Sequence, residues 1–137
     1  MSDGPLAKKM KLKPGMKAAV VNAPEGYSKE LNHDSDISNK LGGKFDWIQV
    51  FVKDKKELAS LAPKAASSLK PDALLWLSFP KGTSKLQTDL TRDRGWGVIR
   101  NLDLKFINLI SVNETWSAFG LRPYNEGEEK QSFQLGE

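Results

Sequence analysis

Residues 74–85, LLWLSFPKGTSK, form an apolar run that ends abruptly in a proline and then in a basic loop rich in hydroxyl groups. A strand that is apolar on both faces is typical of the interior of a covered parallel sheet. Such sheets keep their ligand sites in the loops beyond the carboxyl ends of the strands. The sequence therefore predicts that the loop of residues 81–85 belongs to a functional site at the edge of the sheet. It leaves open which reaction, if any, occurs there.

Strand-like and helix-like stretches alternate around this run. Strands are expected over residues 17–23, 45–52, 106–112 and 116–122, and helices over residues 54–69 and 88–101. Asp54, with Glu57 three places on, has the spacing of a capping box, while Pro63 is expected to kink or restart that helix. The order predicts an α/β protein with a small Rossmann-like three-layer fold, in which a mainly parallel sheet carries a C-terminal antiparallel hairpin.

Composition excludes several kinds of site. With 137 residues, of which 39% are hydrophobic, the chain suits one domain. Cysteine is absent, so disulfides, thiolate metal sites and cysteine nucleophiles are excluded. The single histidine, His33, lies in a polar run and is interpreted as a solvated loop residue. No metal site is predicted.

The net charge of +4 is unevenly distributed along the chain. Residues 1–20 hold five lysines and one acid, whereas residues 123–137 hold four glutamates and one lysine. We expect residues 1–11 to be a disordered basic arm, 12–124 a single Rossmann-like domain and 125–137 a disordered acidic tail. Sparse lysines without interleaved aromatic residues favour a solvated arm over a nucleic-acid-binding one, which stays possible. No stretch is long and apolar enough to span a membrane, and a cytoplasmic protein is expected.

The candidate ligand site follows from the parallel strands, because their carboxyl-end loops emerge on one side. Lysines, hydroxyls and free amides there suit a phosphate or carboxylate. The alternative is that these are solvated loop residues, since the spacing is not that of a phosphate-binding Walker loop. Two roles are open for Trp116: its ring either forms the base of a ligand pocket or packs over the core. The candidate ligand-binding residues are Glu25, Tyr27, Lys81, Thr83, Ser84, Lys85, Glu114 and Trp116.

Two resemblances bear on this interpretation. Residues 22–27, 79–85 and 114–118 are similar to those of a family of short bacterial Rossmann-like proteins known only as a domain of unknown function, which implies the fold and no activity. Residues 13–15, 45–48 and 69–75 with the final hairpin more distantly resemble a reduced class I methyltransferase fold. In that family, a glycine-rich turn and an acid ending the second strand hold S-adenosylmethionine. Only Gly26 matches, so the resemblance implies that cofactor binding is weak or lost.

The function predicted from the sequence is therefore that of an uncharacterised small α/β protein. It would bind an anionic small molecule or a partner at the carboxyl edge of its sheet. No catalytic residue and no cofactor are assigned. The alternatives are a reduced S-adenosylmethionine-dependent methyltransferase-like enzyme and a basic nucleic-acid-binding protein. The oligomeric state is left open.

Overall fold

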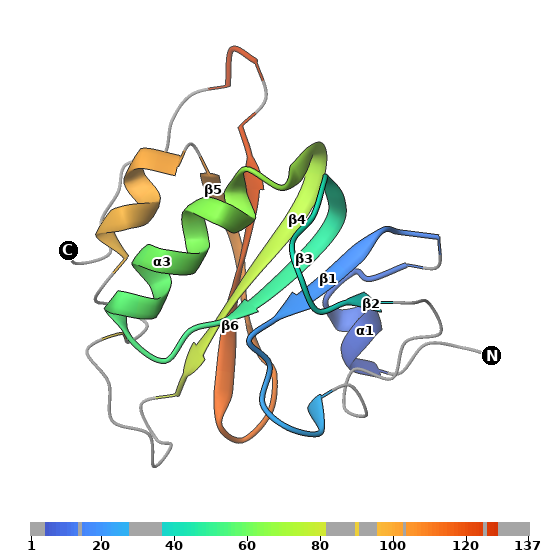
Figure 1. Cartoon of the computed structure of the whole chain (residues 1–137), viewed down its shortest axis with the longest axis vertical. Helices are drawn as coiled ribbons and strands as arrows, with labels where there is room; N and C mark the ends of the chain where they lie inside the picture. Colours follow the sequence, from blue (N-terminus) through green and yellow to red (C-terminus); the bar gives the residue numbers. More distant parts are fainter. Residues whose placement is uncertain are drawn as a thin grey trace.

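The computed structural model describes residues 5–13, 15–27, 37–81, 90, 96–102, 104–124 and 126–128. Its strands are β1 (Ala18–Val21), β2 (Ile37–Ser38), β3 (Phe45–Phe51), β4 (Leu69–Pro80), β5 (Leu104–Ser111) and β6 (Trp116–Pro123). They form one sheet in the order β2-β1-β3-β4-β6-β5 (Figure 1). Strands β2, β1, β3 and β4 are parallel, and β6 runs antiparallel to both β4 and β5. The predicted Rossmann-like α/β class, with its hairpin at one side, is confirmed.

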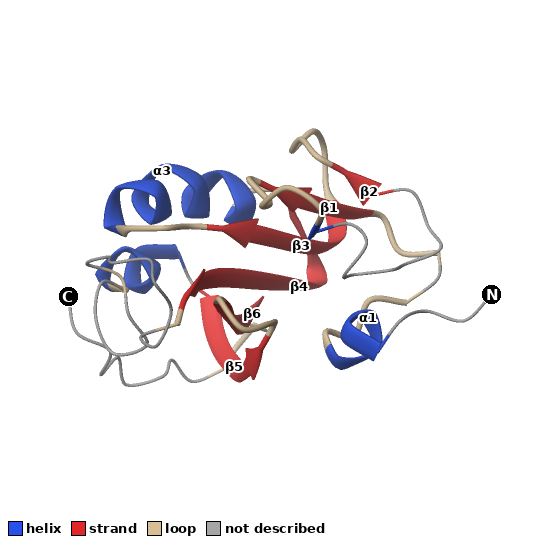
Figure 2. Cartoon of the chain, turned by 90° about the horizontal axis from the view of Figure 1, so that it is seen from below, coloured by secondary structure: helices blue, strands red, loops and turns tan. Residues whose placement is uncertain are grey.

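The central parts of strands β3 and β4 are mostly apolar because both of their faces are covered. On one face lie α3 (Lys55–Ala66) and the 3-10 helix η1 (Gly97–Leu102), which pack on a core that includes Ile48 and Leu75. On the other face lies α1 (Pro5–Lys9), next to a second core that includes Trp47 and Trp76. Figure 2 shows α3 and α1 on opposite sides of the sheet. The sheet is thus the middle of three layers.

Helix α3 begins as the sequence predicts. The Asp54 side chain accepts a hydrogen bond from the Glu57 backbone N–H at 2.8 Å. The Glu57 carboxylate accepts from the Lys53 N–H at 2.7 Å, one residue before the N-cap. These two hydrogen bonds satisfy backbone N–H groups at the start of the helix that have no carbonyl partner within the helix. Pro63 lies inside the helix, which continues to Ala66.

The C-terminal limit of this helix and the start of β4 differ from the expectation. The spacing of apolar residues predicts Leu69 on the helix, but Leu69 pairs with Phe45 as the first residue of β4. The register between β3 and β4 then shifts before Trp47 pairs with Leu74. Pro71, which lacks an N–H, lies within this irregular part of the strand. Such positions tolerate proline inside a sheet.

The expectation of a disordered arm over residues 1–11 requires correction, because residues 5–9 are helical and the segment packs on the sheet. Ala7 and Met10 are fully buried, and Leu12 nearly so. The Met10 carbonyl accepts hydrogen bonds from two indole N–H groups, those of Trp47 at 2.9 Å and Trp76 at 3.0 Å. A carbonyl anchored in this way was not visible in the lysine-rich sequence.

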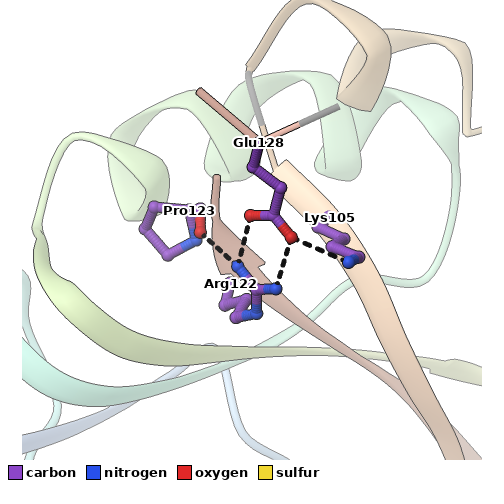
Figure 3. Close-up of polar contacts among 4 residues, drawn as sticks. All are labelled: Lys105, Arg122, Pro123 and Glu128. Atoms are coloured by element: carbon purple, nitrogen blue, oxygen red, sulfur yellow. Dashed lines mark hydrogen bonds and ion pairs between the residues drawn. The ribbon is translucent and has the colours of Figure 1, made fainter. Parts of the chain in front are cut away.

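The acidic tail is corrected in part. Glu128 lies between Arg122 and Lys105 on the last two strands (Figure 3). Arg122 donates to both carboxylate oxygens at 2.9 and 2.7 Å, and Lys105 donates at 2.8 Å. The hydrogen bonds to Glu128 raise the pKa of Arg122. Residues 126–128 therefore fold back on the sheet, and residues 125 and 129–137 lie outside the described part of the chain.

The helix expected over residues 88–101 is described only in part. Leu90 and residues 96–102 are present, the latter ending in η1, and Leu90, Trp96 and Ile99 are buried. Trp96 packs edge-on against Phe79 and Phe119, with ring centroids 5.2 and 4.9 Å away, which makes it a core residue. Among the described residues, no helix is long and apolar enough to cross a membrane.

Candidate functional site

The strand order of the sheet reverses at β1, although the strands on both sides of it are parallel. From β1 the chain moves to one side to form β2, and later to the other side to form β3. In open α/β sheets the carboxyl ends of the two strands that flank such a point form the usual binding crevice. Here these ends are at Val21 and Phe51. The candidate site therefore lies where β1 and β3 end.

Asn22 connects these two strand ends. Its side-chain amide donates to the Phe51 carbonyl at 2.8 Å and to the Glu57 carboxylate at 3.4 Å. Its backbone has a φ of +61°, in the left-handed region that asparagine tolerates better than most residues. One residue thus turns the chain out of β1 and ties it to the end of β3 and the first turn of α3.

A row of three aromatic rings lies beneath this edge. Tyr27 packs edge-on against Phe51, with a centroid distance of 4.7 Å, and Phe51 packs edge-on against Trp116 at 5.0 Å. The Tyr27 hydroxyl donates to Gln49 Oε1 at 2.6 Å, and the Gln49 amide donates to Ser78 Oγ at 2.8 Å. Gln49 and Ser78 are fully buried, so this chain of hydrogen bonds satisfies polar groups inside the core.

Further along the edge, the end of β4 meets the β5–β6 hairpin. The Lys81 N–H donates to the Thr115 carbonyl at 2.8 Å, and its side-chain ammonium donates to Ser111 Oγ at 2.6 Å. Lys9, the last residue of α1, donates to the Ser111 carbonyl at 2.8 Å. The hairpin turn is closed by the Asn113 side chain, which accepts from the Thr115 and Trp116 N–H groups. Two lysines from distant segments therefore meet at Ser111.

The structure places the predicted ligand-binding residues in three groups. Glu25 and Glu114 are exposed in turns that follow β1 and precede β6, and Lys81 is half-buried at the end of β4. Tyr27 and Trp116 are buried, with exposed fractions of 1% and 8%, because their rings pack on Phe51. The Tyr27 and Trp116 rings therefore support the edge from inside, and their contact with a ligand stays a prediction. Thr83, Ser84 and Lys85 lie outside the described residues.

Two residues at this edge were missed by sequence reasoning. Asn22 was included only as part of a turn, although an asparagine between a strand and Ala-Pro is a signal for a left-handed backbone. Lys9 was assigned to a loose arm, and its contact with Ser111 spans 102 residues of sequence. No local pattern encodes such a contact.

Comparison with known proteins shows likeness at the level of structure. No family model matches the chain, and no curated protein matches its sequence. A ribosomal protein L11 methylase from Lactobacillus delbrueckii subsp. bulgaricus is similar with a TM-score of 0.58 and 14% identity, over 87% of this chain and 76% of that one. Magnesium protoporphyrin IX methyltransferase from Synechocystis PCC 6803, with bound SAH, gives 0.57 and 10%, over 86% and 78%. An O-methyltransferase family 2 protein from Planctomyces limnophilus gives 0.61 and 12%, over 87% and 56%.

These likenesses establish a methyltransferase-like Rossmann fold, and they correct the function predicted from the sequence. The predicted function, an uncharacterised binding protein with no assignable catalysis, is contradicted, because these three solved structures of the same fold are named as a methylase or as methyltransferases. Anion binding gains no support from them. The resemblance to the bacterial family of unknown function is not confirmed, since no family model matches.

Proposed function

We propose that this chain is a reduced S-adenosylmethionine-dependent methyltransferase-like enzyme, with its cofactor at the carboxyl ends of β1 and β3. The observation that carries the proposal is the strand order. From β1 the chain forms β2 on one side and then β3 on the other side. The fold shared with the Synechocystis methyltransferase, whose structure holds SAH, supports it. The likeness covers 86% of this chain, so it includes both halves of the sheet.

The turn after β1 fits a ligand that approaches the backbone closely. Gly26 has a φ of +82°, and a Cβ built on it would meet no atom within 4 Å. Asn22, at φ +61°, starts the same turn, and Glu25 is exposed within it. An open, left-handed turn of this kind lets main-chain donors face a ligand without a side chain intervening. Residues 22–26 would hold the methionine part of the cofactor.

The end of β2 fits the ribose less well. This strand has two residues, and Ser38 is followed by an exposed asparagine, Asn39, where the family has an acid. A neutral acceptor forms a hydrogen bond worth about 0.5–1.5 kcal/mol, against roughly 1.5–3 kcal/mol for a charged one. We therefore expect S-adenosylmethionine to bind this chain about tenfold more weakly than it would bind the same site with a carboxylate.

When bound, S-adenosylmethionine supplies an electrophilic methyl group. The chain's own part is to orient an acceptor and to keep water away. The buried rings of Tyr27, Phe51 and Trp116 provide an apolar floor for this edge. Glu25 and Glu114, both exposed at the same edge, are two carboxylates that could take a proton from the acceptor.

Isothermal titration calorimetry with S-adenosylmethionine and its demethylated product tests the proposal. We expect the wild type to bind both, and Asn39→Asp to bind them about tenfold more tightly because it restores a charged acceptor. Asn108→Asp is the matched control, since Asn108 is exposed on β5 at the far side of the sheet. Absence of heat at millimolar ligand for both wild type and Asn39→Asp would reject the proposal. Equal tightening by Asn108→Asp would show a nonspecific charge effect.

A further inference from the structure

We propose that residues 5–13, together with Lys81, form a surface that binds the phosphodiester backbone of a nucleic acid. The lysines that carry it in the first segment are Lys8, Lys9, Lys11 and Lys13, and we call this set the lysine surface. If the proposed methyltransferase function holds, on which this further step rests, nucleic acid is the substrate class. The binding itself needs no cofactor and is tested without one.

The first step is that the segment is held in place. A helix of five residues is not stable alone in water. Here its apolar side is buried through Ala7 and Met10, and the Met10 carbonyl is fixed by the two indole groups of Trp47 and Trp76. The positions of the lysines are therefore fixed relative to the sheet, so fewer conformations are lost when they bind a ligand.

The second step is the charge. Lys8, Lys9, Lys11 and Lys13 are all exposed, and residues 5–24 contain no acidic side chain. In the described part of the chain, Lys8, Lys11 and Lys13 form no ion pair. Some lysines elsewhere in the described part of the chain are paired with acids, as in Lys70 with Asp46 and Lys105 with Glu128. Among the described residues, the segment thus presents positive charge without an acidic partner, which a polyanion complements.

The third step concerns the backbone at Lys11, whose φ is +60°. The Leu12 N–H donates to the Ala7 carbonyl at 2.9 Å, and the Lys11 N–H donates to the Lys8 carbonyl at 3.1 Å. These two bonds form a Schellman motif, in which glycine is the usual residue at the left-handed position. A lysine held in a conformation that favours glycine points to a use for its charge.

The fourth step connects this surface to the candidate site. Lys9 and Lys81 both donate to Ser111, to its carbonyl and its hydroxyl respectively. Lys81 directly follows β4 at the carboxyl edge, where its N–H donates to the Thr115 carbonyl. A strand bound along the lysine surface would therefore reach the edge where the proposed cofactor lies.

An acidic membrane would also attract lysines, but the structure favours nucleic acid. Binding in a membrane interface requires an apolar helix face that enters the lipid. In α1 that face is already used against the sheet, through Ala7 and Met10. Among the described residues, the large exposed apolar side chains are Ile107 and Leu109, both on β5. The lysine surface thus offers charge without an apolar partner for lipid.

The test is fluorescence anisotropy with a labelled single-stranded RNA, the same DNA strand and a DNA duplex, at several salt concentrations. The variant Lys8→Gln/Lys11→Gln removes two charges from the lysine surface. The matched control Lys56→Gln/Lys64→Gln removes two exposed charges from α3, on the opposite face. We expect the wild type to bind with a steep salt dependence. For single strands, the first variant should lower the slope of log K against log salt by about 1.4, and the control should leave it unchanged.

A third variant separates charge from stability. Lys11→Gly suits the left-handed backbone, so it should raise the melting temperature while it weakens RNA binding. Lost binding therefore cannot be attributed to unfolding. Equal weakening by both double variants, or absence of wild-type binding to all three nucleic acids at low salt, would overturn the proposal. So would tighter binding to phosphatidylserine vesicles than to RNA. Failure here leaves the calorimetric result for the cofactor unaffected, and the reverse also holds.

Discussion

The indole ring of Trp76 lies directly against Gly120, its partner across the antiparallel β4–β6 pair. A Cβ placed on residue 120 would lie 2.8 Å from Cζ3 and 3.0 Å from Cη2 of that ring. The same indole donates its N–H to the Met10 carbonyl at 3.0 Å. The glycine therefore leaves room for the ring that anchors the N-terminal segment to the sheet.

Gly120→Ala should destabilise the protein by about 1–3 kcal/mol, the usual cost of overpacking a core. The added methyl group must displace the ring of Trp76, which is almost completely buried. Chemical denaturation followed by tryptophan fluorescence measures the change. Gly42→Ala is the control, because nothing lies within 4 Å of its Cβ and its φ is not positive. A Gly120→Ala protein as stable as the control would contradict the packing described.

Deletion of residues 1–10 should lower the melting temperature by at least about 5 °C. It removes the buried side chains of Ala7 and Met10, and it leaves the indole N–H groups of Trp47 and Trp76 without their acceptor. An unsatisfied buried donor costs about 1–3 kcal/mol, and in a domain of this size 1 kcal/mol corresponds to roughly 2–4 °C. Thermal denaturation provides the measurement. An unchanged melting temperature would show that the segment contributes nothing to stability.

The contrast between the N-terminal segment and the central strands shows what the sequence could predict. Strands β3 and β4 were visible because continuous apolar residues have few other uses, and the start of α3 was visible because Asp54 and Glu57 have a cap spacing. Residues 5–12 bury three side chains at spacings of three and two, which match neither helix nor strand. Their main anchor is a backbone carbonyl, and sequence carries no sign of it.

Replacement of Asn22 should separate its two roles. Asn22→Gly keeps the left-handed backbone and loses the amide that donates to Phe51 and Glu57. Asn22→Ala loses the amide and also strains the backbone, which adds about 1 kcal/mol. Denaturation should therefore rank wild type above glycine and glycine above alanine. If the alanine variant equals or exceeds the glycine variant in stability, the left-handed turn after β1 is not present in solution.

The sequence predicted which segments share an edge of the sheet, and ligand binding at that edge stays a prediction. Parallel strands place their loops together, and Lys81, Glu25 and Glu114 do lie in segments at the carboxyl edge. The burial of Tyr27 could not be foreseen, because it depends on Phe51 and on a buried glutamine, Gln49, from a different strand. Contacts between distant segments determine which polar residues at an edge face solvent. A single sequence does not contain that information.

Asp46 should make stability depend on pH in the acid range. Its carboxylate accepts from the Lys17 N–H at 2.8 Å and pairs with Lys70 at 3.2 Å, and the Lys17 hydrogen bond above all lowers its pKa below the ordinary 3.8. A carboxylate with a lowered folded-state pKa stabilises the protein above its unfolded-state pKa.

Asp46→Asn keeps an oxygen acceptor for Lys17 and removes the charge. At pH 7 this variant should be the less stable protein, by an amount within the ~0.2–1 kcal/mol of exposed ion pairs. The difference should shrink as the pH falls through and below 3.8 and vanish once Asp46 is protonated. Urea denaturation from pH 7 to pH 2 measures it. A difference that persists unchanged at pH 2 would argue against the assigned charge interaction.

The position of the cofactor is tested most directly by titrating the ¹⁵N-labelled protein with S-adenosylhomocysteine and following backbone amide shifts by NMR. The proposed site predicts the largest, saturable changes in three segments, residues 22–27, 38–39 and 52–53, where β1, β2 and β3 end. Ile107 and Leu109 on β5 should not shift. Shifts centred on β5, or no saturable shift at any residue, would contradict a methyltransferase-like site at the carboxyl ends of β1 and β3.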